Sequence, residues 1–360
     1  GDDRLAANET VNRLNEWMDA RFMNTVVFAD MSEEEAARPT QWRLWRQLPP
    51  NGRIALFAGA LMRAAVQRVS GEVSERRFSK WIRHTAGLQN QLVADGALVL
   101  KFFLHTPVDK QRKKLRKAEK KPDQGWRVDK RDWIALDQMG PRMPVVERIL
   151  RETSTPGAPW MIVEATDSRY RDLTVARTIL AALNARLEEP AMSGPALADS
   201  VFGDVDAAAN VLSGVDLTKQ LDRTTYRREL ARAQAKLHKV SLEARKRGVS
   251  TVLAFEGWDA AGKGGVIRRV TQSLEAGDYR VIPVAAPTEE ERQYHYMWRF
   301  WRDLPQSGRF VIFDRTWYGR VLVERVEGFA TPAEWQRAYD EINDFESQMI
   351  ERGYYVAKFW

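Results

Sequence analysis

Short apolar runs and longer amphipathic stretches alternate along the C-terminal half of the chain. The short runs predict strands at 250–256, 279–284, 309–313 and 354–359. Apolar residues at helical spacing predict helices at 226–247, 263–275, 289–302 and 332–351. Strands that alternate with helices are typical of a parallel sheet covered on both faces. We therefore predict an α/β fold for this half.

The N-terminal half shows similar patterns and one additional feature. An apolar run at 158–166 is followed by helical spacing at 176–187. The additional feature is "KQRKKLRKAEKK" at 110–121, which predicts a strongly basic helix. Residues 188–225 contain the Pro-, Gly- and Ser-bearing stretch between the halves, and we predict that they form a linker.

The two halves align with each other over a long stretch. Residues 1–57, moved along by 256 positions, match 257–313 without a gap, and seventeen of the 57 aligned pairs are identical. Within this stretch "QWRLWRQLPPNGRIALF" (41–57) falls on "MWRFWRDLPQSGRFVIF" (297–313). A period this long is not that of a solenoid, so it indicates a duplicated domain.

The match resumes after a slip of one residue, and it sets the predicted domain boundaries. "DGALVLKFF" (95–103) falls on "RGYYVAKFW" (352–360). We therefore predict two tandem copies, 1–187 and 226–360, joined by the linker. The first copy continues beyond residue 103 and the second has no counterpart of that continuation. We expect that the chain is a fragment in which the second copy lacks its end.

Composition and charge narrow the class of protein. The hydrophobic share is 44% and the charged share 29%, which suits a globular chain. No apolar run approaches the roughly 18 residues of a membrane helix. The absence of cysteine is compatible with a reducing compartment, and we expect a cytoplasmic protein without a membrane partner. The net charge of +7 favours a polyanionic ligand, yet no nucleic-acid-binding motif is present.

"GWDAAGKGG" (257–265) follows a predicted strand and opens a predicted helix, which is typical of a phosphate-binding loop. Such a loop directs backbone N–H groups toward one phosphate, helped by the helix N-terminus. Glycine allows close approach of the backbone, and Lys263 adds a positive charge. The alternative is a glycine-rich turn without a ligand. The predicted phosphate-binding glycines are Gly257, Gly262, Gly264 and Gly265.

The loop lacks the Ser or Thr that normally follows the lysine and binds Mg²⁺. Two carboxylates are candidate replacements: Asp259 lies inside the loop, and Asp314 ends the predicted strand at 309–313. Mg²⁺ prefers oxygen ligands and keeps several waters, so two carboxylates and substrate phosphates suffice. Asp259 could instead orient or deprotonate the attacking group, or stabilise the turn. A helix cap is the alternative role for Asp314.

Arginines near both segments are candidate phosphate ligands, because guanidinium groups match phosphate oxygens in bidentate geometry. Arg315 and Arg320 flank the Asp314 carboxylate in sequence. Arg268 and Arg269 follow the loop on a predicted helix surface, where such residues are more often simply solvated. The aromatic stretch 294–305 recurs in the first copy, so we expect a packing role there at least as much as a functional one.

The first copy has lost these reactive groups. Lys263 aligns with alanine at position 7, Asp314 with alanine at position 58, and Arg315 with glycine at position 59. We predict that the first copy retains the scaffold and is catalytically dead.

Three motifs together resemble the polyphosphate kinase 2 family. They are "GWDAAGKGGVIRRV", "PTEEERQYHYMWRFWRDLP" and "FDRTWYGRVLVERVEGF". The two-copy layout is similar to the branch of this family that phosphorylates AMP with inorganic polyphosphate. The resemblance covers nearly the whole chain and is considerably more specific than a phosphate loop alone.

The resemblance implies a P-loop kinase-like α/β domain in each copy and an enzyme that makes ADP from AMP and polyphosphate. It implies Mg²⁺, with Mn²⁺ as a substitute, and roles in catalysis for Asp259, Lys263, Asp314, Arg315 and Arg320. In this family a lid follows the strand ending in "KFW". The first copy has a lid-like segment at 104–150. The second copy has none within this chain, so we expect that the fragment could be inactive.

Two other functions fit parts of the pattern. An ATP-dependent nucleoside or nucleotide kinase would use the same loop, and a polyphosphate-against-ATP donor test separates it. A non-catalytic polyanion-binding module would tolerate loss of Lys263. The sequence leaves open whether AMP or a nucleoside diphosphate is preferred, which bases are accepted, which direction dominates, and whether the protein is a homo-oligomer.

Overall fold

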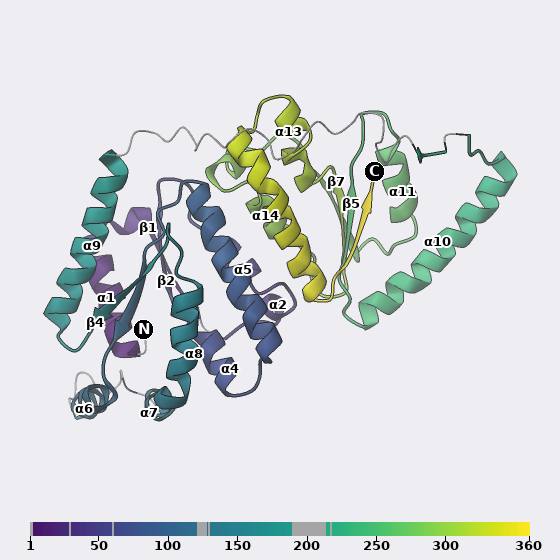
Figure 1. Ribbon diagram of the computed structural model, residues 1–360. Helices are drawn as coiled ribbons and strands as arrows, with labels where there is room; N and C mark the ends of the chain where they lie inside the picture. The colour runs from purple at the N-terminus through teal and green to yellow at the C-terminus, as the bar shows by residue number, and fades with distance from the viewer. Residues whose placement is uncertain are drawn as a thin grey trace. The chain divides into compact units, whose positions relative to one another are not determined.

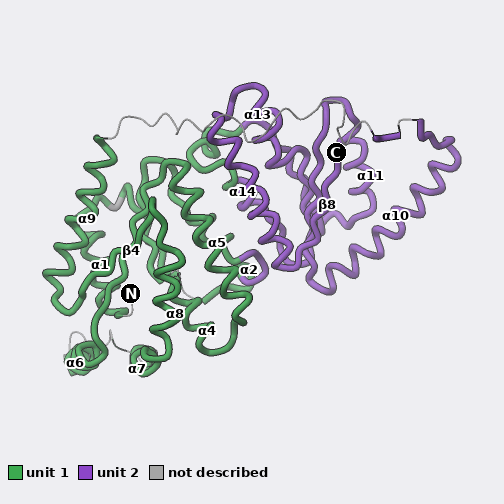
Figure 2. The backbone as a smooth tube through the Cα atoms, in the orientation of Figure 1, with its two compact units in different colours: residues 1–35, 40–190, 287–298 green, residues 36–39, 191–286, 299–360 purple. Residues whose placement is uncertain are grey.

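The computed structural model describes residues 3–28, 30–59, 61–120, 128, 130–188, 214–216 and 218–360. The chain divides into two compact units, coloured separately in Figure 2. Unit 1 comprises residues 1–35, 40–190 and 287–298, and unit 2 comprises residues 36–39, 191–286 and 299–360. Most of the predicted linker lies outside the described residues, so its bounds stay a prediction.

Unit 2 contains a four-stranded parallel sheet in the order β6-β7-β5-β8. This arrangement confirms the predicted α/β class, and the strands begin and end within one residue of the predicted bounds. Its elements are α10 (Arg223–Lys246), β5 (Thr251–Phe255), α11 (Lys263–Thr271), β6 (Tyr279–Pro283), α12 (Trp298–Arg302), β7 (Phe310–Asp314), η5 (Trp317–Arg320), α13 (Val323–Val326), α14 (Pro332–Glu351) and β8 (Tyr355–Phe359).

Helices cover both faces of this sheet because its central strands are apolar on both sides. All five residues of β5 are buried, as are the first four of β7. On one face Leu253 and Ile312 pack with Ile267 of α11. On the other face Phe313 meets the Trp317 ring, which in turn packs edge-on against α14. Figure 1 shows α11 and α14 on either side of the strands.

One predicted helix of the second copy, 289–302, is wrong as a single element. It consists of a 3-10 turn, η4 (Glu291–Gln293), followed by the short α12. The backbone between them is extended at Tyr294, with φ −130° and ψ 162°. The Tyr294 ring stacks on Trp298 with centroids 4.1 Å apart. The aromatic spacing resembled a helix, but ring packing fixes the chain in two pieces.

Unit 1 contains two separate parallel strand pairs, β1–β2 and β3–β4. The repeat places β1 and β2 on β6 and β7, which are also paired in parallel. The elements are α1 (Arg4–Trp17), η1 (Ala20–Phe22), β1 (Met23–Val27), α2 (Glu33–Ala36), α3 (Trp42–Trp45), β2 (Ile54–Ala58), α4 (Met62–Val69), α5 (Glu75–Ala94), β3 (Lys101–His105), α6 (Val108–Glu119), α7 (Lys130–Asp137), α8 (Met139–Glu152), β4 (Trp160–Glu164) and α9 (Ser168–Glu188).

Helices also cover both faces of the β3–β4 pair. Neighbouring residues of a strand point to opposite faces, and here both are buried. Phe103 packs in a cluster with α4, α5 and α8, whereas Leu104 packs in a cluster with α1 and α9. No helix in the described part of the chain is both long and apolar enough to cross a membrane.

The backbone confirms that the units are copies. Left-handed φ values recur at aligned positions, where side chains beyond glycine are disfavoured. In three aligned pairs both residues are glycine: Gly52 with Gly308, Gly71 with Gly328, and Gly96 with Gly353. In a fourth pair unit 1 has Gly59, with φ +78°, and unit 2 has Arg315, with φ +65°. The two copies therefore share this backbone conformation, with glycine at the position in unit 1 and arginine in unit 2.

A buried lysine in unit 1 gives a testable pH dependence. Lys101 of β3 is 7% exposed, and its Nζ donates to Gln89 Oε1 at 2.7 Å. Burial lowers the pKa of Lys101 to about 8. Between pH 8 and the ordinary lysine pKa near 10.4, the unfolded chain therefore binds more protons than the folded protein. The free energy of unfolding should rise through this window, by at most about 3 kcal/mol.

Denaturant unfolding at pH 7 to 11 measures this effect. Lys101→Met should remove the rise, because the variant has no ionisable group at this position. Lys113→Met on the exposed face of α6 is the matched control and should keep it. A rise of equal size in wild type and Lys101→Met would assign the pH dependence to another group.

Candidate active site

A pocket of about 490 Å³ lies at the carboxyl ends of three strands in unit 2. The segments that line it follow β5, end β6 and end β7. Strands β7 and β8 lie on opposite sides of β5, and ligands of open α/β sheets bind at such a point. The lining residues are Asp259, Ala260, Ala261, Gly262, Lys263, Gly264, Gly265, Pro283, Val284, Ala285, Asp314 and Arg315.

The predicted phosphate loop forms one wall of this pocket. Its backbone turns through left-handed conformations at Gly257 (φ +134°), Ala260 (φ +64°) and Gly262 (φ +94°). Helix α11 begins directly after Gly262, at Lys263. The first N–H groups of any helix have no acceptor within the helix, so they can bind a phosphate. The turn and helix start thus have the geometry expected of an anion site.

Lys263 lies across the loop. Its Nζ donates to the carbonyl oxygens of Gly257 at 2.7 Å and Trp258 at 2.8 Å. The side chain is half-buried and lines the pocket. These contacts keep the ammonium group beside the loop, where a phosphate would gain most from its charge.

Asp259 and Asp314 line the same pocket. Asp314 ends β7, opposite Phe255 in the strand register, and Asp259 lies in the loop that follows β5. Arg315 joins them: its Nη2 donates to Asp259 Oδ1 at 2.6 Å. The structure therefore brings Asp259 and Lys263 of the loop together with Asp314 and Arg315, which lie more than 50 residues further along the sequence.

The other predicted arginines do not line the pocket. Arg320 lies in η5 and pairs with Glu324 at 3.0 Å. Arg269 donates to the Gly265 carbonyl at 2.7 Å and to the Tyr226 hydroxyl, so its guanidinium is directed toward α10. Arg268 is exposed on α11. Phosphate binding by these three residues stays a prediction.

Glu256, between β5 and the loop, was missed by the sequence reasoning. Its Oε1 accepts hydrogen bonds from both the backbone N–H and the hydroxyl of Thr316, each at 2.6 Å. Burial raises the pKa of Glu256, and the Thr316 bonds and the charges of Lys263 and Arg315 oppose that rise. The available signal was an acidic residue at the end of an apolar strand, directly before the glycine loop.

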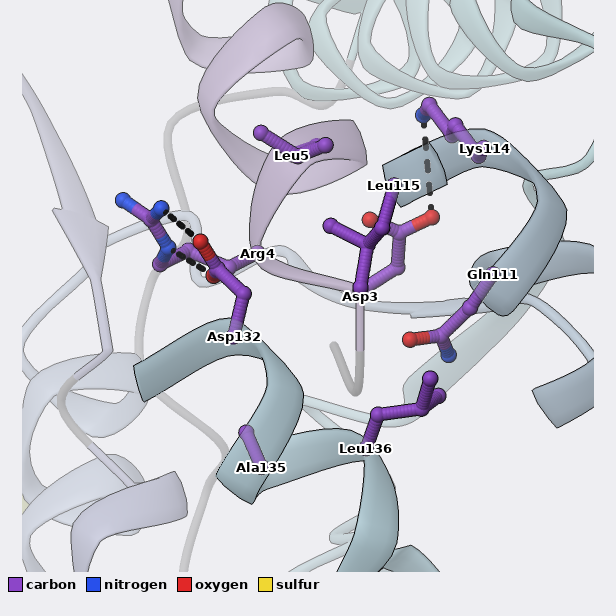
Figure 3. Close-up of a pocket in the computed structure, with 9 residues that line it drawn as sticks. All are labelled: Asp3, Arg4, Leu5, Gln111, Lys114, Leu115, Asp132, Ala135 and Leu136. Atoms are coloured by element: carbon purple, nitrogen blue, oxygen red, sulfur yellow. Dashed lines mark hydrogen bonds and ion pairs between the residues drawn. The ribbon is translucent and has the colours of Figure 1, made fainter. Parts of the chain in front are cut away.

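At the aligned place in unit 1, side chains of α1, α6 and α7 line a much smaller cavity (Figure 3). The cavity there measures about 30 Å³, room for about one water molecule. It lies between the start of α1 and the helices α6 and α7 of the predicted lid-like segment. Leu5, which aligns with Ala261 of the loop, packs with Leu115, Leu136 and Met139.

Charged groups hold the same helices against α1. Arg4 pairs with Asp132 of α7 (Figure 3). Lys114 of α6 lies 3.6 Å from Asp3 and 3.4 Å from Glu9. Asp3 aligns with Asp259 of the loop, and its Oδ1 caps α1 by accepting the Ala6 N–H. Carboxylates of unit 1 thus neutralise Arg4 and Lys114, the positive groups that a bound phosphate would otherwise contact.

Leu5→Ala tests this closure, because alanine is the residue that unit 2 has at the aligned position. Leu5 is 8% exposed, so the change should leave a cavity and cost about 2–4 kcal/mol. Hydrogen exchange should accelerate in α6 and α7. Leu180→Ala, at a side chain 59% exposed on α9, is the control and should change exchange little. Unaltered exchange in the Leu5 variant would show that α6 and α7 are held by other contacts.

Comparison with known proteins matches both copies to one family. The family model described as "Polyphosphate kinase 2 (PPK2)" matches residues 1–190 and 220–360. The chain belongs to the polyphosphate kinase 2 family. The resemblance seen in the sequence motifs is therefore confirmed.

Relatives within the polyphosphate kinase 2 family align over the full chain. A polyphosphate:AMP phosphotransferase of Pseudomonas aeruginosa is 44% identical over 363 residues, covering 100% of this chain and 73% of the relative. One of Acinetobacter johnsonii with the same name is 31% identical, covering 100% and 72%. A crystal structure of a Pseudomonas aeruginosa PA01 protein assigned to polyphosphate kinase 2 superposes with a TM-score of 0.82 at 42% identity, covering 98% of this chain and 69% of that one.

Proposed function

We propose that the chain transfers the terminal phosphoryl group of inorganic polyphosphate to AMP, giving ADP, in the pocket of unit 2. One observation carries the proposal. The phosphate loop, two carboxylates and Arg315 line one pocket. The relatives that align over the whole of this chain are named polyphosphate:AMP phosphotransferases. The proposal also explains the net charge of +7, since both substrates are anions.

The lining residues suit in-line phosphoryl transfer. An oxygen of the AMP phosphate attacks the terminal phosphorus of polyphosphate, and the bond from that phosphorus to the bridging oxygen breaks. The shortened polyphosphate leaves with the bridging oxygen. Lys263 and the first N–H groups of α11 bind the transferred group, and Arg315 stabilises its equatorial charge.

Asp259 and Asp314, which both line the pocket, would hold a divalent ion. In the described residues no group of three or more His, Cys, Asp or Glu side chains could hold a metal. An ion here would use two carboxylates, with phosphate oxygens and water as the remaining ligands. Mg²⁺ is commonly bound in this way, and Mn²⁺ accepts the same donors. When bound, the ion neutralises charge on the phosphate oxygens.

Unit 1 contributes no second reaction centre under this proposal. Its counterpart of Lys263 is Ala7, that of Asp314 is Ala58, and its cavity is too small for a phosphate.

A donor test decides the function. The protein is incubated with AMP, Mg²⁺ and either polyphosphate or ATP, and the products are separated by anion exchange. We expect ADP with polyphosphate, and loss of ADP when EDTA removes the metal. Parallel reactions with ADP and GDP as acceptors test the acceptor class. Formation of ADP from AMP with ATP but not with polyphosphate would identify a nucleotide kinase instead.

A further inference from the structure

Arg315 has a backbone conformation that its residue type disfavours. Its φ of +65° lies in the left-handed region, where a side chain beyond glycine is strained. The aligned residue of unit 1, Gly59, adopts the same region with φ +78°. In unit 1 the residue with this left-handed conformation is a glycine, whereas in unit 2 it is the arginine that lines the pocket. Something next to Arg315 must hold its backbone in place.

Hydrogen bonds on both sides of Arg315 tie it to the end of β5. Its own N–H donates to the carbonyl oxygen of Phe255 at 2.9 Å. The N–H and hydroxyl of the next residue, Thr316, both donate to Glu256 Oε1 at 2.6 Å. The backbone of Arg315 is therefore fixed before and after its Cα, by the last residue of β5 and by the residue that follows it.

We propose that Glu256 is a positioning residue for phosphoryl transfer. Through Thr316 its carboxylate holds Arg315 in the left-handed conformation and so directs the guanidinium across the pocket, where Nη2 meets Asp259 at 2.6 Å. This role rests on the function proposed above. Glu256 itself does not line the pocket, and it acts on the substrate only through Arg315.

The repeat supports this assignment. The position aligned with Thr316 is Ala60, which has no hydroxyl to donate. Unit 1 therefore lacks both the arginine and the threonine side chain that fixes it. A hydrogen bond needed only for folding would be expected in both copies.

A second carboxylate provides a matched control. Glu346 of α14 is 9% exposed and accepts from Trp317 Nε1 at 3.0 Å and Tyr318 Oη at 2.8 Å. These bonds hold η5, the turn that begins directly after Thr316, against α14. Glu346 makes no hydrogen bond to Asp314 or Thr316, the two residues that flank Arg315. Its other oxygen, Oε2, accepts from Lys358 Nζ at 2.8 Å, so Glu346→Gln weakens the contacts of η5 and of Lys358 but leaves both neighbours of Arg315 unchanged.

Binding of tripolyphosphate, measured by calorimetry, tests the proposal without requiring turnover. Glu256→Ala and Thr316→Val should each weaken binding about tenfold. Thr316→Ser keeps the hydroxyl and should bind within about twofold of wild type. Glu256→Gln keeps one acceptor oxygen and should be intermediate. Glu346→Gln should bind like wild type. Circular dichroism and thermal unfolding confirm that each variant is folded.

The Arg315→Gly background shows whether Glu256 acts through Arg315. There, Glu256→Ala should weaken tripolyphosphate binding no further, because the side chain that it positions is absent. An equal loss in both backgrounds, or no loss in either, would overturn the proposal. In turnover assays kcat should fall about 10–100-fold while KM for AMP stays unchanged. Wild type that binds tripolyphosphate but yields no ADP would contradict the proposed function alone.

Discussion

Lys263→Ala should lower the rate of ADP formation from polyphosphate and AMP by about 10³-fold. The ammonium group lies on the phosphate loop, within hydrogen-bond distance of the carbonyl oxygens of Gly257 and Trp258. Charge moves between oxygens during phosphoryl transfer, and a fixed positive charge beside them acts at short range. Alanine is also the residue that unit 1 has at the aligned position, so the fold accepts it.

Initial rates at saturating AMP and polyphosphate measure the loss. Lys239→Ala is the matched control, because it removes the same charge from an exposed position on α10. If attraction of the polyanion by net charge were the whole effect, the two variants would lose activity equally. A Lys263 variant with less than about fivefold loss would contradict a catalytic role for this loop.

Arg315→Gly should be inactive and yet more stable than Arg315→Ala. Both changes remove the guanidinium from the pocket, and each should lower kcat by at least about 10²-fold. Only glycine releases the left-handed strain at φ +65°, which costs roughly 1–2 kcal/mol for other residues. The greater freedom of glycine in the unfolded chain offsets about 0.5–1 kcal/mol of this gain. The net difference should be about 0.5–1 kcal/mol in favour of glycine.

Denaturant unfolding measures the difference in free energy of unfolding between Arg315→Gly and Arg315→Ala, and the sign of this difference tests the prediction. The lost ion pair with Asp259 is the same in both variants and does not enter the comparison. At Arg228 on the exposed face of α10, an ordinary helical position, the order should reverse, with glycine about 1 kcal/mol less stable than alanine. If Arg315→Gly is instead the less stable variant, the residue is not strained and its conformation needs no support from Glu256.

The sequence predicted the fold of unit 2 well because its strands are continuous apolar runs bounded by turns. β5 and β7 are buried on both faces, so their hydrophobicity is unbroken and easily recognised. α14 matches its predicted bounds, 332–351, because Thr331 and Glu334 form a capping box at its start. The failure at 289–302 came from aromatic residues, whose ring packing depends on neighbours that the sequence does not identify.

The pocket was predictable in part. Asp314 ends β7, and Asp259, Lys263 and Arg315 follow the ends of β5 and β7. The ends of adjacent parallel strands meet at one edge of a sheet. The partners of Arg320 and Arg269 were not predictable, since several carboxylates and carbonyls lie within reach of a long side chain. Glu256 was missed because its role appears only when Thr316 is placed beside it.

The closure of unit 1 could not have been predicted from the substitutions alone. The alignment places Ala7 opposite Lys263, which predicts that unit 1 lacks the activity but does not predict which residues occupy the place of a ligand. The structure shows Leu5 among the apolar residues of α6 and α7, and Asp132 paired with Arg4. These contacts join residues more than 100 positions apart, and no local pattern encodes them.

Gly59 limits which side chains unit 1 can accept at the position aligned with Arg315. A Cβ at this position would lie 3.3 Å from the carbonyl oxygen of Phe28, and its φ of +78° would strain any other residue. An arginine placed there would destabilise unit 1, and the aligned sequence offers neither the loop lysine nor the threonine hydroxyl beside it. Under the proposed function, a second reaction centre in unit 1 would therefore need several substitutions together, and the first of them alone would cost stability.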